Sequence, residues 1–437
     1  MKFPNTVDKN IFKAYIDPKV VRRRQIHNGI NSMDLKWTTV VNGPETLKML
    51  CIKALAEGWI ANPIYSELIF DVDRNYLLDI LNLDFPVSDL SAKIQEDSFW
   101  QRFFMAKWPQ CYPLKRNRPW IKIFMEKYLS EKMENMKHED YEEERLLQLL
   151  ELCAPHVENF YLSQLQPNMT SSEMDHNDHV VPLNTVLSNL PELRKIDLTY
   201  DLKTVGTNFY LGCGNISAND IKWLTEGLAK CFELQEFRLH SSKLDAGMLK
   251  LLGMALDKGC KNLEVLSLPH CRCGDSGLLA FLEALGPESL PNIHTLDLTN
   301  NFLTFDGILQ LSFVIRRRRI TTLNLKLNPI KSDGANAIFG ALKDMQTREL
   351  NLSCCSLDSS MSFLLLKIIN ECTTLKRLNL SVNKFTVELG EKITEIIPNN
   401  RNLLELDLRN TEVSTISRMI IDDYILKNRL SNNDATG

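Results

Sequence analysis

Long apolar runs are absent from this chain of 437 residues, and none reaches the roughly 20 residues that a membrane-spanning helix needs. The first residues lack the apolar core of a secretory signal peptide. A charge excess is missing too, because 51 Lys and Arg residues stand against 55 Asp and Glu residues. The net charge of −4 therefore implies no general attraction to nucleic acid.

Motifs of the common enzyme classes are equally absent. The chain has no Gly-x-x-x-x-Gly-Lys-Ser/Thr loop for phosphate and no Gly-x-Ser-x-Gly turn for a nucleophilic serine. With 44% hydrophobic residues, the sequence is nevertheless ample for a large core. We therefore expect a folded protein with neither catalytic activity nor a cofactor.

The second half of the chain is filled by eight copies of the pattern L-x-x-L-x-L-x-x-(N/C/polar). Successive first positions are 41, 29, 30, 27, 27, 28 and 28 residues apart. This period is typical of long leucine-rich repeats, in which each strand is followed by a helix. The first positions are Leu193, Leu234, Leu263, Ile293, Ile320, Thr347, Leu375 and Leu403.

The residue types of the repeat predict an α/β fold, a leucine-rich-repeat solenoid shaped like the ribonuclease-inhibitor horseshoe. The last two leucines of each copy have strand spacing and point inward together. The following Asn or Cys turns inward and can satisfy backbone groups that the bending chain leaves buried. One copy cannot bury its own apolar face, so neighbouring copies stack.

Four segments are expected along the chain. Residues 1–43 look irregular, residues 44–155 form an α-helical capping domain, residues 156–425 form the repeat domain, and residues 426–437 form a disordered tail. A degenerate ninth repeat opens the solenoid at Val157, Phe160 and Leu162.

Helical periodicity marks the capping domain at residues 46–59, 73–81, 87–94, 97–107, 120–136 and 138–153. We expect this domain to close the N-terminal end of the solenoid, which would otherwise expose an edge strand. Trp100 and Trp108 are more readily explained as core residues of this domain than as partner contacts.

The strand positions between the inward leucines should line the concave face. They are polar, balanced in sign and without an aromatic residue. Since Trp, Tyr and Arg are enriched among interface hot spots, the best anchors that this surface offers are Arg238, Arg377 and Arg409, together with His240. Lys326 completes this set of candidates. A solvated ladder with no partner explains the same residues equally well. The positions are Lys195, Asp197, Thr199, Glu236, Arg238, His240, Val265, Ser267, Pro269, Thr295, Asp297, Thr299, Thr322, Asn324, Lys326, Glu349, Asn351, Ser353, Arg377, Asn379, Ser381, Glu405, Asp407 and Arg409.

Two polar segments depart from the repeat. Residues 167–180 read as an exposed loop after the degenerate strand. The gap of 41 residues between the first two full repeats holds an insertion of roughly a dozen residues, and such insertions are often functional. Its candidate binding residues are Asp201, Lys203, Asn208 and Phe209.

Signals for metals or special charge are weak. The segment Asp175–His179 has metal-ligand residue types but lies in a polar loop, and the cysteines at 271, 273, 354 and 355 lack a second pair at zinc-site spacing. We expect no metal and reduced cysteines. The run Arg316–Arg319 suits a helix C-terminus, with an acidic partner as the alternative.

Motifs outside the repeats carry a more specific resemblance. They are the Trp-x₇-Trp-Pro-x-Cys string at residues 100–111, the aromatic-basic helix at residues 120–129, and the insertion that begins Thr-Tyr-Asp-Leu-Lys at residue 199. Together they resemble the family of subunit 5 of the nexin–dynein regulatory complex, also called T-complex-associated testis-expressed protein 1. The resemblance covers roughly residues 45–425.

This resemblance implies a non-enzymatic scaffold subunit in the axoneme of cilia and flagella. Such a subunit helps to link outer doublet microtubules and to regulate dynein-driven motility, including that of sperm. The implied partners are other subunits of the complex, and dynein or the doublet microtubule surface, with no nucleic acid and no membrane.

Two other classes share the repeats alone. Leucine-rich-repeat GTPase-activating proteins have the same period but a strongly acidic C-terminal tail, whereas this tail is short and mixed. An inhibitor that grips a basic enzyme would need an acidic concave face, and this face is balanced in sign.

Overall fold

The computed structural model describes residues 46–61, 63–65, 68, 70–111, 118–167, 178–200, 216–286, 289–342 and 346–434. The chain divides into two compact units, residues 1–103 and 104–437. Helix α7 (Asp97–Lys107) spans the division. Helices α8 (Trp120–Glu134) and α9 (Glu143–Cys153) thus share a unit with the strands, whereas the sequence grouped them with the preceding helices.

The first unit is a small helical core. It comprises α4 (Leu47–Glu57), α5 (Asp71–Ile80), α6 (Val87–Ser91) and the start of α7. Trp100 is fully buried, and its indole nitrogen donates a hydrogen bond to the Ile94 carbonyl at 2.9 Å. Phe99 packs edge-on against the Trp100 ring, with centroids 5.5 Å apart. Trp100 is therefore the core residue that the sequence predicted.

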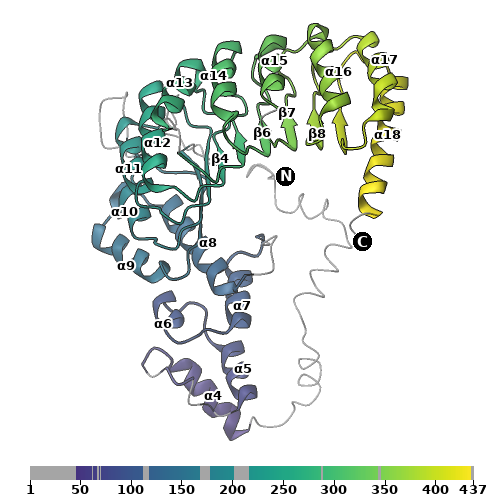
Figure 1. Cartoon of the computed structure of the whole chain (residues 1–437). Helices are drawn as coiled ribbons and strands as arrows, with labels where there is room; N and C mark the ends of the chain where they lie inside the picture. Colours follow the sequence, from purple (N-terminus) through teal and green to yellow (C-terminus); the bar gives the residue numbers. More distant parts are fainter. Residues whose placement is uncertain are drawn as a thin grey trace, which may run out of the picture. The chain divides into compact units, whose positions relative to one another are not determined.

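The second unit is the predicted leucine-rich-repeat solenoid. All strands described are parallel and follow one another in chain order, so that β1 and β9 are the edges of a nine-stranded sheet. Helices cover the side of the stack opposite the strands (Figure 1). The strands are β1 (Asn159–Leu162), β2 (Lys195–Thr199), β3 (Glu236–His240), β4 (Val265–Ser267), β5 (Thr295–Asp297), β6 (Thr322–Asn324), β7 (Glu349–Asn351), β8 (Arg377–Asn379) and β9 (Glu405–Asp407).

The helices of the repeats begin with α10 (Leu183–Ser188) and end with α18. The bounds are α11 (Ala218–Leu228), α12 (Ala246–Gly259), α13 (Gly274–Ala284), α14 (Phe305–Ile315), α15 (Lys331–Ala341), α16 (Ser362–Glu371), α17 (Val387–Ile396) and α18 (Thr415–Asp434).

Where a repeat has an asparagine after its strand, the side chain bonds to buried backbone groups, as predicted. Asn328 Nδ2 donates to the carbonyls of Leu298 and Leu325 at 2.9 and 2.8 Å. Its Oδ1 accepts the amides of Asn301 and Leu303 at 2.8 and 3.1 Å. One buried side chain thus satisfies four backbone groups in two repeats, and this confirms the prediction.

Strands β2 to β9 also all start in the same way. Two consecutive amides donate to a single carbonyl of the preceding repeat, as Leu404 and Glu405 do to Lys376 at 2.7 and 3.0 Å. Each repeat therefore needs one acceptor from the repeat before it. The first strand has no preceding repeat and must find that acceptor elsewhere.

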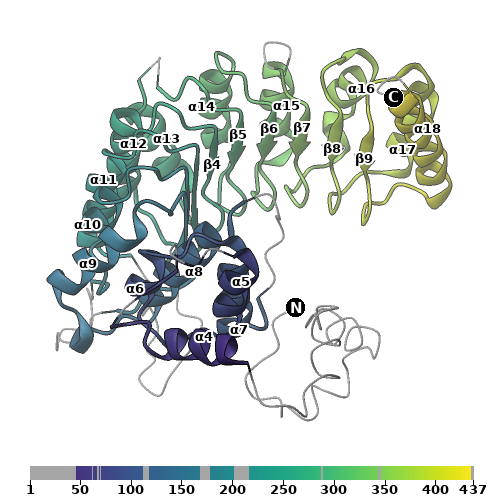
Figure 2. The ribbon, with the colours of Figure 1, turned by 90° about the horizontal axis from the view of Figure 1, so that it is seen from below.

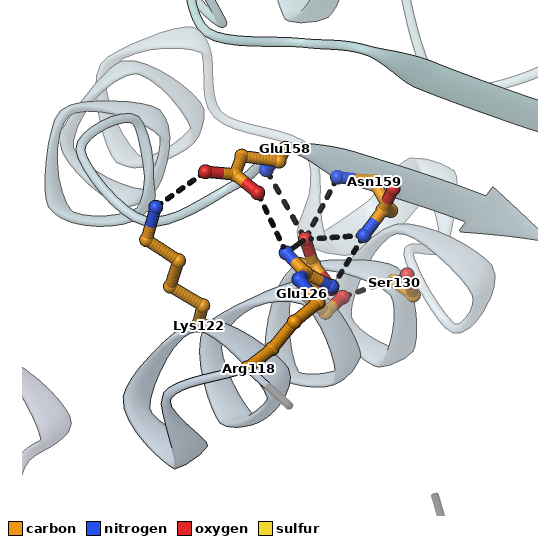
Figure 3. Close-up of polar contacts among 6 residues, drawn as sticks. All are labelled: Arg118, Lys122, Glu126, Ser130, Glu158 and Asn159. Atoms are coloured by element: carbon orange, nitrogen blue, oxygen red, sulfur yellow. Dashed lines mark hydrogen bonds and ion pairs between the residues drawn. The ribbon is translucent and has the colours of Figure 1, made fainter. Parts of the chain in front are cut away.

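Helix α8 supplies it (Figure 3). Glu126 Oε1 accepts the amides of Glu158 and Asn159 at 3.1 and 2.7 Å, so its carboxylate replaces the missing carbonyl. Arg118 pairs with both carboxylate oxygens of Glu126 at 2.8 and 2.7 Å. Eight residues along α8, Glu134 Oε1 accepts the amide of Ser163 at 2.7 Å. Helix α8 thus closes the edge of β1 at both ends of the strand.

The electrostatics around Glu126 support this closure. Lys122 and Arg118 both reach the Glu158 carboxylate, Arg118 at 3.2 Å. The hydrogen bond from Lys122, followed by the charges of Lys122 and Arg118, lowers the pKa of Glu158. The hydrogen bond to Glu126 raises the pKa of Arg118. Each carboxylate of the cluster is thus matched to a cation, Glu126 to Arg118 and Glu158 to both Arg118 and Lys122.

Helix α18 closes the opposite end and corrects one prediction. Residues 426–434, expected to belong to a disordered tail, continue the helix to Asp434. Ile421 and Ile425 of α18 are buried, with 1% and 3% exposure. Asn428 Nδ2 donates to the carbonyls of Asn400 and Leu403 at 2.9 and 3.0 Å. Arg429 Nε donates to Leu404 at 2.5 Å. The tail prediction was wrong because these anchors are polar and leave no apolar period in the sequence.

The Leu404 carbonyl is the one that a next repeat would use. In the register of the sheet it is equivalent to the Lys376 carbonyl, which accepts the two amides at the start of β9. The two ends of the solenoid are therefore closed by opposite chemistry, an acceptor from Glu126 at β1 and a donor from Arg429 at β9.

Candidate protein-binding surface

The strands present a polar face, as predicted. In β2 and β3, buried leucine, isoleucine or phenylalanine alternates with half-buried polar residues. The register aligns Asp197 with Arg238 and Thr199 with His240 across neighbouring strands. Since side chains alternate along a strand, these residues share the face opposite the buried leucines.

Charged residues gather on this face at β2 and β3. Lys195 Nζ lies 2.7 Å from Glu236 Oε2, and Arg238 Nη2 lies 3.6 Å from the same oxygen. His240 Nε2 lies 3.3 Å from Asp197 Oδ1. We call these five residues, with Tyr161 described next, the β1–β3 cluster.

Tyr161 is the residue of this cluster that the sequence missed. It pairs in register with Asp197 from strand β1 and is 41% exposed. Lys195 Nζ lies 5.7 Å from the centre of its ring, which is within the range of a cation–π contact. Burial of its ring side, followed by the charges of Glu126 and Glu236, raises the pKa of Tyr161 to about 12. The face therefore does hold an aromatic residue, contrary to expectation. The spacing of Val157, Phe160 and Leu162 already placed Tyr161 there.

A second charged group occupies β7–β9. Arg377 reaches both Glu349 and, at 3.8 Å, Glu405, so one cation links three strands. Arg409 makes a two-pronged contact with Asp407 at 2.9 and 2.7 Å. Its hydrogen bonds hold the pKa of Asp407 below the usual range.

Between the two groups, the middle strands are nearly free of charge. A hollow of about 230 Å³ extends from β6, with Thr322 and Asn324, into the charged group of β7–β9, where Glu349, Arg377 and Glu405 line it. Lys326 is exposed beyond β6, and its backbone amide donates to Asn324 Oδ1 at 3.2 Å. The face is thus divided into two charged ends and a neutral middle.

The predicted arginine anchors are engaged within the chain. Arg238, Arg377 and Arg409 each contact a carboxylate of the same or a neighbouring strand. Arg238 keeps one uncommitted group, because its buried Nε has no acceptor among the described residues. A partner on this face must therefore share the existing ion pairs, and their role in binding stays a prediction.

The insertion begins directly beside the β1–β3 cluster. Its candidates Asp201, Lys203, Asn208 and Phe209 lie outside the described residues. The flanking residues Tyr200 and Ile216 are buried, with 1% and 5% exposure. The described chain is therefore held in the core on both sides of the insertion, at the end of β2 and just before α11.

A buried His–Asp pair lies at the start of α11, where the described chain resumes after the insertion. His179 Nδ1 lies 2.7 Å from Asp220 Oδ2, and both side chains are 1% exposed. Asp220 also closes a capping box with Ser217 at the start of α11. Burial would raise the pKa of Asp220, but hydrogen bonds from His179 and the Ser217 amide outweigh burial and lower it. This pair joins the end of the 167–180 loop to α11.

Other residues singled out in the sequence make contacts within the repeats. Arg316 follows the last residue of α14, as predicted for a helix C-terminus. Cys271 Sγ contacts the Leu239 carbonyl at 3.2 Å and Cys355 Sγ the Leu325 carbonyl at 3.3 Å, in the asparagine position of the repeat. Burial raises the pKa of both thiols to about 12. The cysteines in the described ranges are free, and no cluster of His, Cys, Asp and Glu there is arranged to hold a metal ion. None of the described helices is both long and apolar enough to cross a bilayer.

Comparison with known proteins confirms the resemblance seen in the motifs. Residues 319–339 match the family model described as Leucine Rich repeat. Dynein regulatory complex subunit 5 of Macaca fascicularis is 26% identical over 289 residues, covering 61% of this chain and 57% of that protein. The mouse protein of the same name is 27% identical over 60% of this chain and 54% of its own length.

The similarity extends to a green alga. Subunit 5 of Chlamydomonas reinhardtii is 24% identical over 47% of this chain and 50% of its own length. This chain thus spans somewhat more than half the length of the curated relatives that it matches. Among solved structures, the second actin-binding site of leiomodin-1 is 17% identical over 44% of this chain and 91% of that chain, with a TM-score of 0.27. A superposition this loose carries no functional argument.

Proposed function

We propose that this chain is a non-enzymatic scaffold subunit of an axonemal nexin–dynein regulatory complex. The observation that carries the proposal is the similarity to subunit 5 of that complex in primates, mouse and an alga. The polar strand face, without a metal cluster in the described residues, supports a binding role over catalysis. In this role the chain binds other subunits between outer doublet microtubules and takes part in regulating dynein-driven motility of cilia and flagella, including that of sperm.

The mechanism we propose is geometric. Each repeat contacts only its neighbours, so a stack of nine parallel strands behaves as a stiff spacer. The closure of β1 by helix α8 limits edge-to-edge association with other chains at that strand. A spacer of this kind transmits force between bound subunits without an internal chemical step.

The β1–β3 cluster and the neighbouring insertion are the proposed contact region. Tyr161 and Arg238 belong to the residue types that dominate protein interfaces. Arg238 has an uncommitted Nε, and His240 is only 33% exposed, so both side chains are partly preorganised by their carboxylate partners. Arg377, Arg409 and Lys326 extend the proposal to the other end of the face.

The test is localisation and extraction in a ciliated cell. The endogenous chain is tagged, axonemes are demembranated, and proteins are released with increasing salt. Retention in the axoneme and release together with doublet-link proteins is the expected result. A signal confined to the cytosol or the nuclear envelope contradicts the proposal and favours the GTPase-activating class.

The contact region has its own test in the same cells. The double change Arg238→Ala and His240→Ala should lower retention of the tagged chain, because it removes two anchors and leaves the strands intact. Lys250→Ala, on the exposed side of α12, is the matched control. Equal retention of both variants would exclude Arg238 and His240 as anchors.

A further inference from the structure

Helix α18 closes the edge of the last strand only in part. Strand β9 pairs only with β8 in the described sheet, and its other side borders a groove of about 480 Å³. All five residues from Glu405 to Arg409 line this groove. Since alternate residues point to opposite faces of a strand, contact with five consecutive residues places the groove along the strand edge.

Helix α18 forms the other wall of the groove. It contributes Arg418, Met419 and Asp422 among others. Figure 2 shows α18 beside β9 at the end of the sheet. The groove is therefore a slot with a strand edge on one side and a helix on the other.

Two backbone donors of this edge lack a partner. In the preceding pair of repeats, the Leu380 amide donates to the Asp407 carbonyl and the Val382 amide to the Arg409 carbonyl, both at 2.9 Å. The register makes Leu408 and Asn410 their equivalents at the free edge. No acceptor for either amide lies within the described part of the chain. Arg429 caps the edge only at its start, on the Leu404 carbonyl.

Among the charged groups of the groove, one hydrogen-bond donor likewise lacks an acceptor in the described residues. Arg409 is held by Asp407, and Glu405 lies 3.8 Å from Arg377. Arg418 Nη2 donates to Thr415 Oγ1 at 3.3 Å, but its Nε has no acceptor among described residues. Arg418 thus adds a partly unsatisfied cation to the two open amides, and all three groups require acceptors.

We propose that this groove binds an extended acidic segment of another protein as an additional strand beside β9. Carbonyl groups of the segment accept the amides of Leu408 and Asn410, and one of its carboxylates pairs with Arg418. Strand addition supplies affinity through main-chain hydrogen bonds and specificity through alternate side chains. Met419, 68% exposed, offers an apolar contact for a side chain of the segment. The inference names a contact for the scaffold proposed above but does not depend on which complex that scaffold joins.

A second copy of this chain fits the groove less well. A symmetric pair would place β9 against β9 and would give each groove the same donors. Both copies would then bring Arg418 to the contact, while the carboxylates of Glu405 and Asp407 already face Arg377 and Arg409, so that only Asp422 would be left to pair with an arginine of the other copy. Charge therefore favours a different, acidic partner.

The test uses the full chain in solution, with ¹⁵N labelling and deuteration. The probe is a blocked Val-Glu-Val-Glu-Val-Glu peptide, and the matched peptide replaces each glutamate with glutamine. The expected result is that the acidic peptide shifts the amide resonances of Leu408 and Asn410 and binds more tightly than the neutral peptide. Arg418→Gln should weaken binding of the acidic peptide by about five-fold or more, as expected for loss of one charge-assisted contact.

Arg317→Gln is the control, because Arg317 is an exposed arginine outside the groove. It should leave the affinity unchanged. Three results overturn the proposal: no shift at Leu408 and Asn410, equal binding to the wild type and to Arg418→Gln, or a concentration-dependent dimer, seen by light scattering, that occupies the edge. None of these results bears on retention in the axoneme, so failure here is distinguishable from failure of the proposed function.

Discussion

At the scale of single residues, the turn after each strand is built on a left-handed backbone. The second residue after the last leucine of the repeat has a positive φ throughout the full repeats after the insertion, including 53° at Asn300, 59° at Val382 and 56° at Asn410. Asparagine tolerates this conformation, whereas a β-branched residue is strained in it. The repeat therefore imposes the turn even where the residue type opposes it.

This strain predicts a stabilising substitution. Val382 is 48% exposed, so Val382→Asn loses little burial and relieves the backbone. We expect the free energy of unfolding to rise by about 0.5–1 kcal/mol in urea denaturation. Val387→Asn is the control, because Val387 is 42% exposed but begins helix α17. A gain equal at both positions would refute the backbone explanation.

The buried Asp220–His179 pair predicts a pH dependence. A carboxyl group whose pKa is lower in the folded than in the unfolded state adds stability above its unfolded pKa, here 3.8, and loses it as the pH falls through the folded pKa. Asp220→Asn should therefore lower the Tm at pH 7, and its difference from the wild type should shrink below about pH 4. Asp333→Asn, exposed in the first turn of α15, serves as the control. A difference that stays constant from pH 7 to pH 3 would rule out the electrostatic origin.

At the scale of elements, two helices end the solenoid by opposite means. Helix α8 offers carboxylates to the amides of β1, and α18 offers side-chain nitrogens to carbonyls beside β9. Both helices act through polar bonds to the backbone, in addition to apolar packing. Hydrophobic periodicity alone therefore finds the helices but not their role.

The α8 closure can be tested at Glu126, which is 5% exposed. Glu126→Gln removes the charge that Arg118 pairs with and weakens the acceptor for two β1 amides. We expect a loss of about 2–4 kcal/mol in the free energy of unfolding, typical of breaking a buried charged contact. Glu139→Gln, exposed in the turn after α8, should change stability by less than about 0.5 kcal/mol. Similar values for both variants would show that Glu126 does not cap β1.

The α18 closure predicts an effect of shortening the helix. Removal of residues 426–437 deletes Asn428 and Arg429 and leaves three carbonyls near β9 without their donors. Faster hydrogen exchange at β9, with a loss of about 2–3 kcal/mol, should follow. Removal of residues 435–437 alone keeps both side chains and is the control. Unchanged exchange at β9 after the longer truncation would mean that α18 does not close the sheet.

At the scale of the whole molecule, the sequence predicted the structural features that recur in every repeat and missed those that occur only once. Leucines at strand spacing and the asparagine position located the strands from β2 to β9, because the same packing selects the same residue types in every copy. Tyr161 was missed because its repeat is degenerate. Glu126 was missed because a carboxylate that mimics a carbonyl has no fixed spacing from the strand it serves. The binding residues of the insertion remain a prediction.

The insertion allows a test of the whole assembly. Deletion of Leu202–Cys213 should spare folding, because both flanking residues, Tyr200 and Ile216, are anchored in the core. It should weaken incorporation into the axonemal complex, measured as retention of the tagged chain. A Gly/Ser segment of equal length separates loss of sequence from loss of spacing. Unchanged incorporation with either variant would remove the insertion from the contact region.

The opposite closures have a consequence for how the length of such a molecule can change. Each repeat donates two amide hydrogen bonds to the repeat before it and accepts two from the repeat after it. The Lys376 carbonyl, for example, accepts the two amides at the start of β9. Gain or loss of a single repeat leaves the chemistry at Glu126 and Arg429 untouched. It moves the two ends apart or together by about 4.8 Å, the spacing of adjacent strands. Duplication of a repeat is therefore a mutation that changes the distance between two attachment points and requires no change in the residues that close either end.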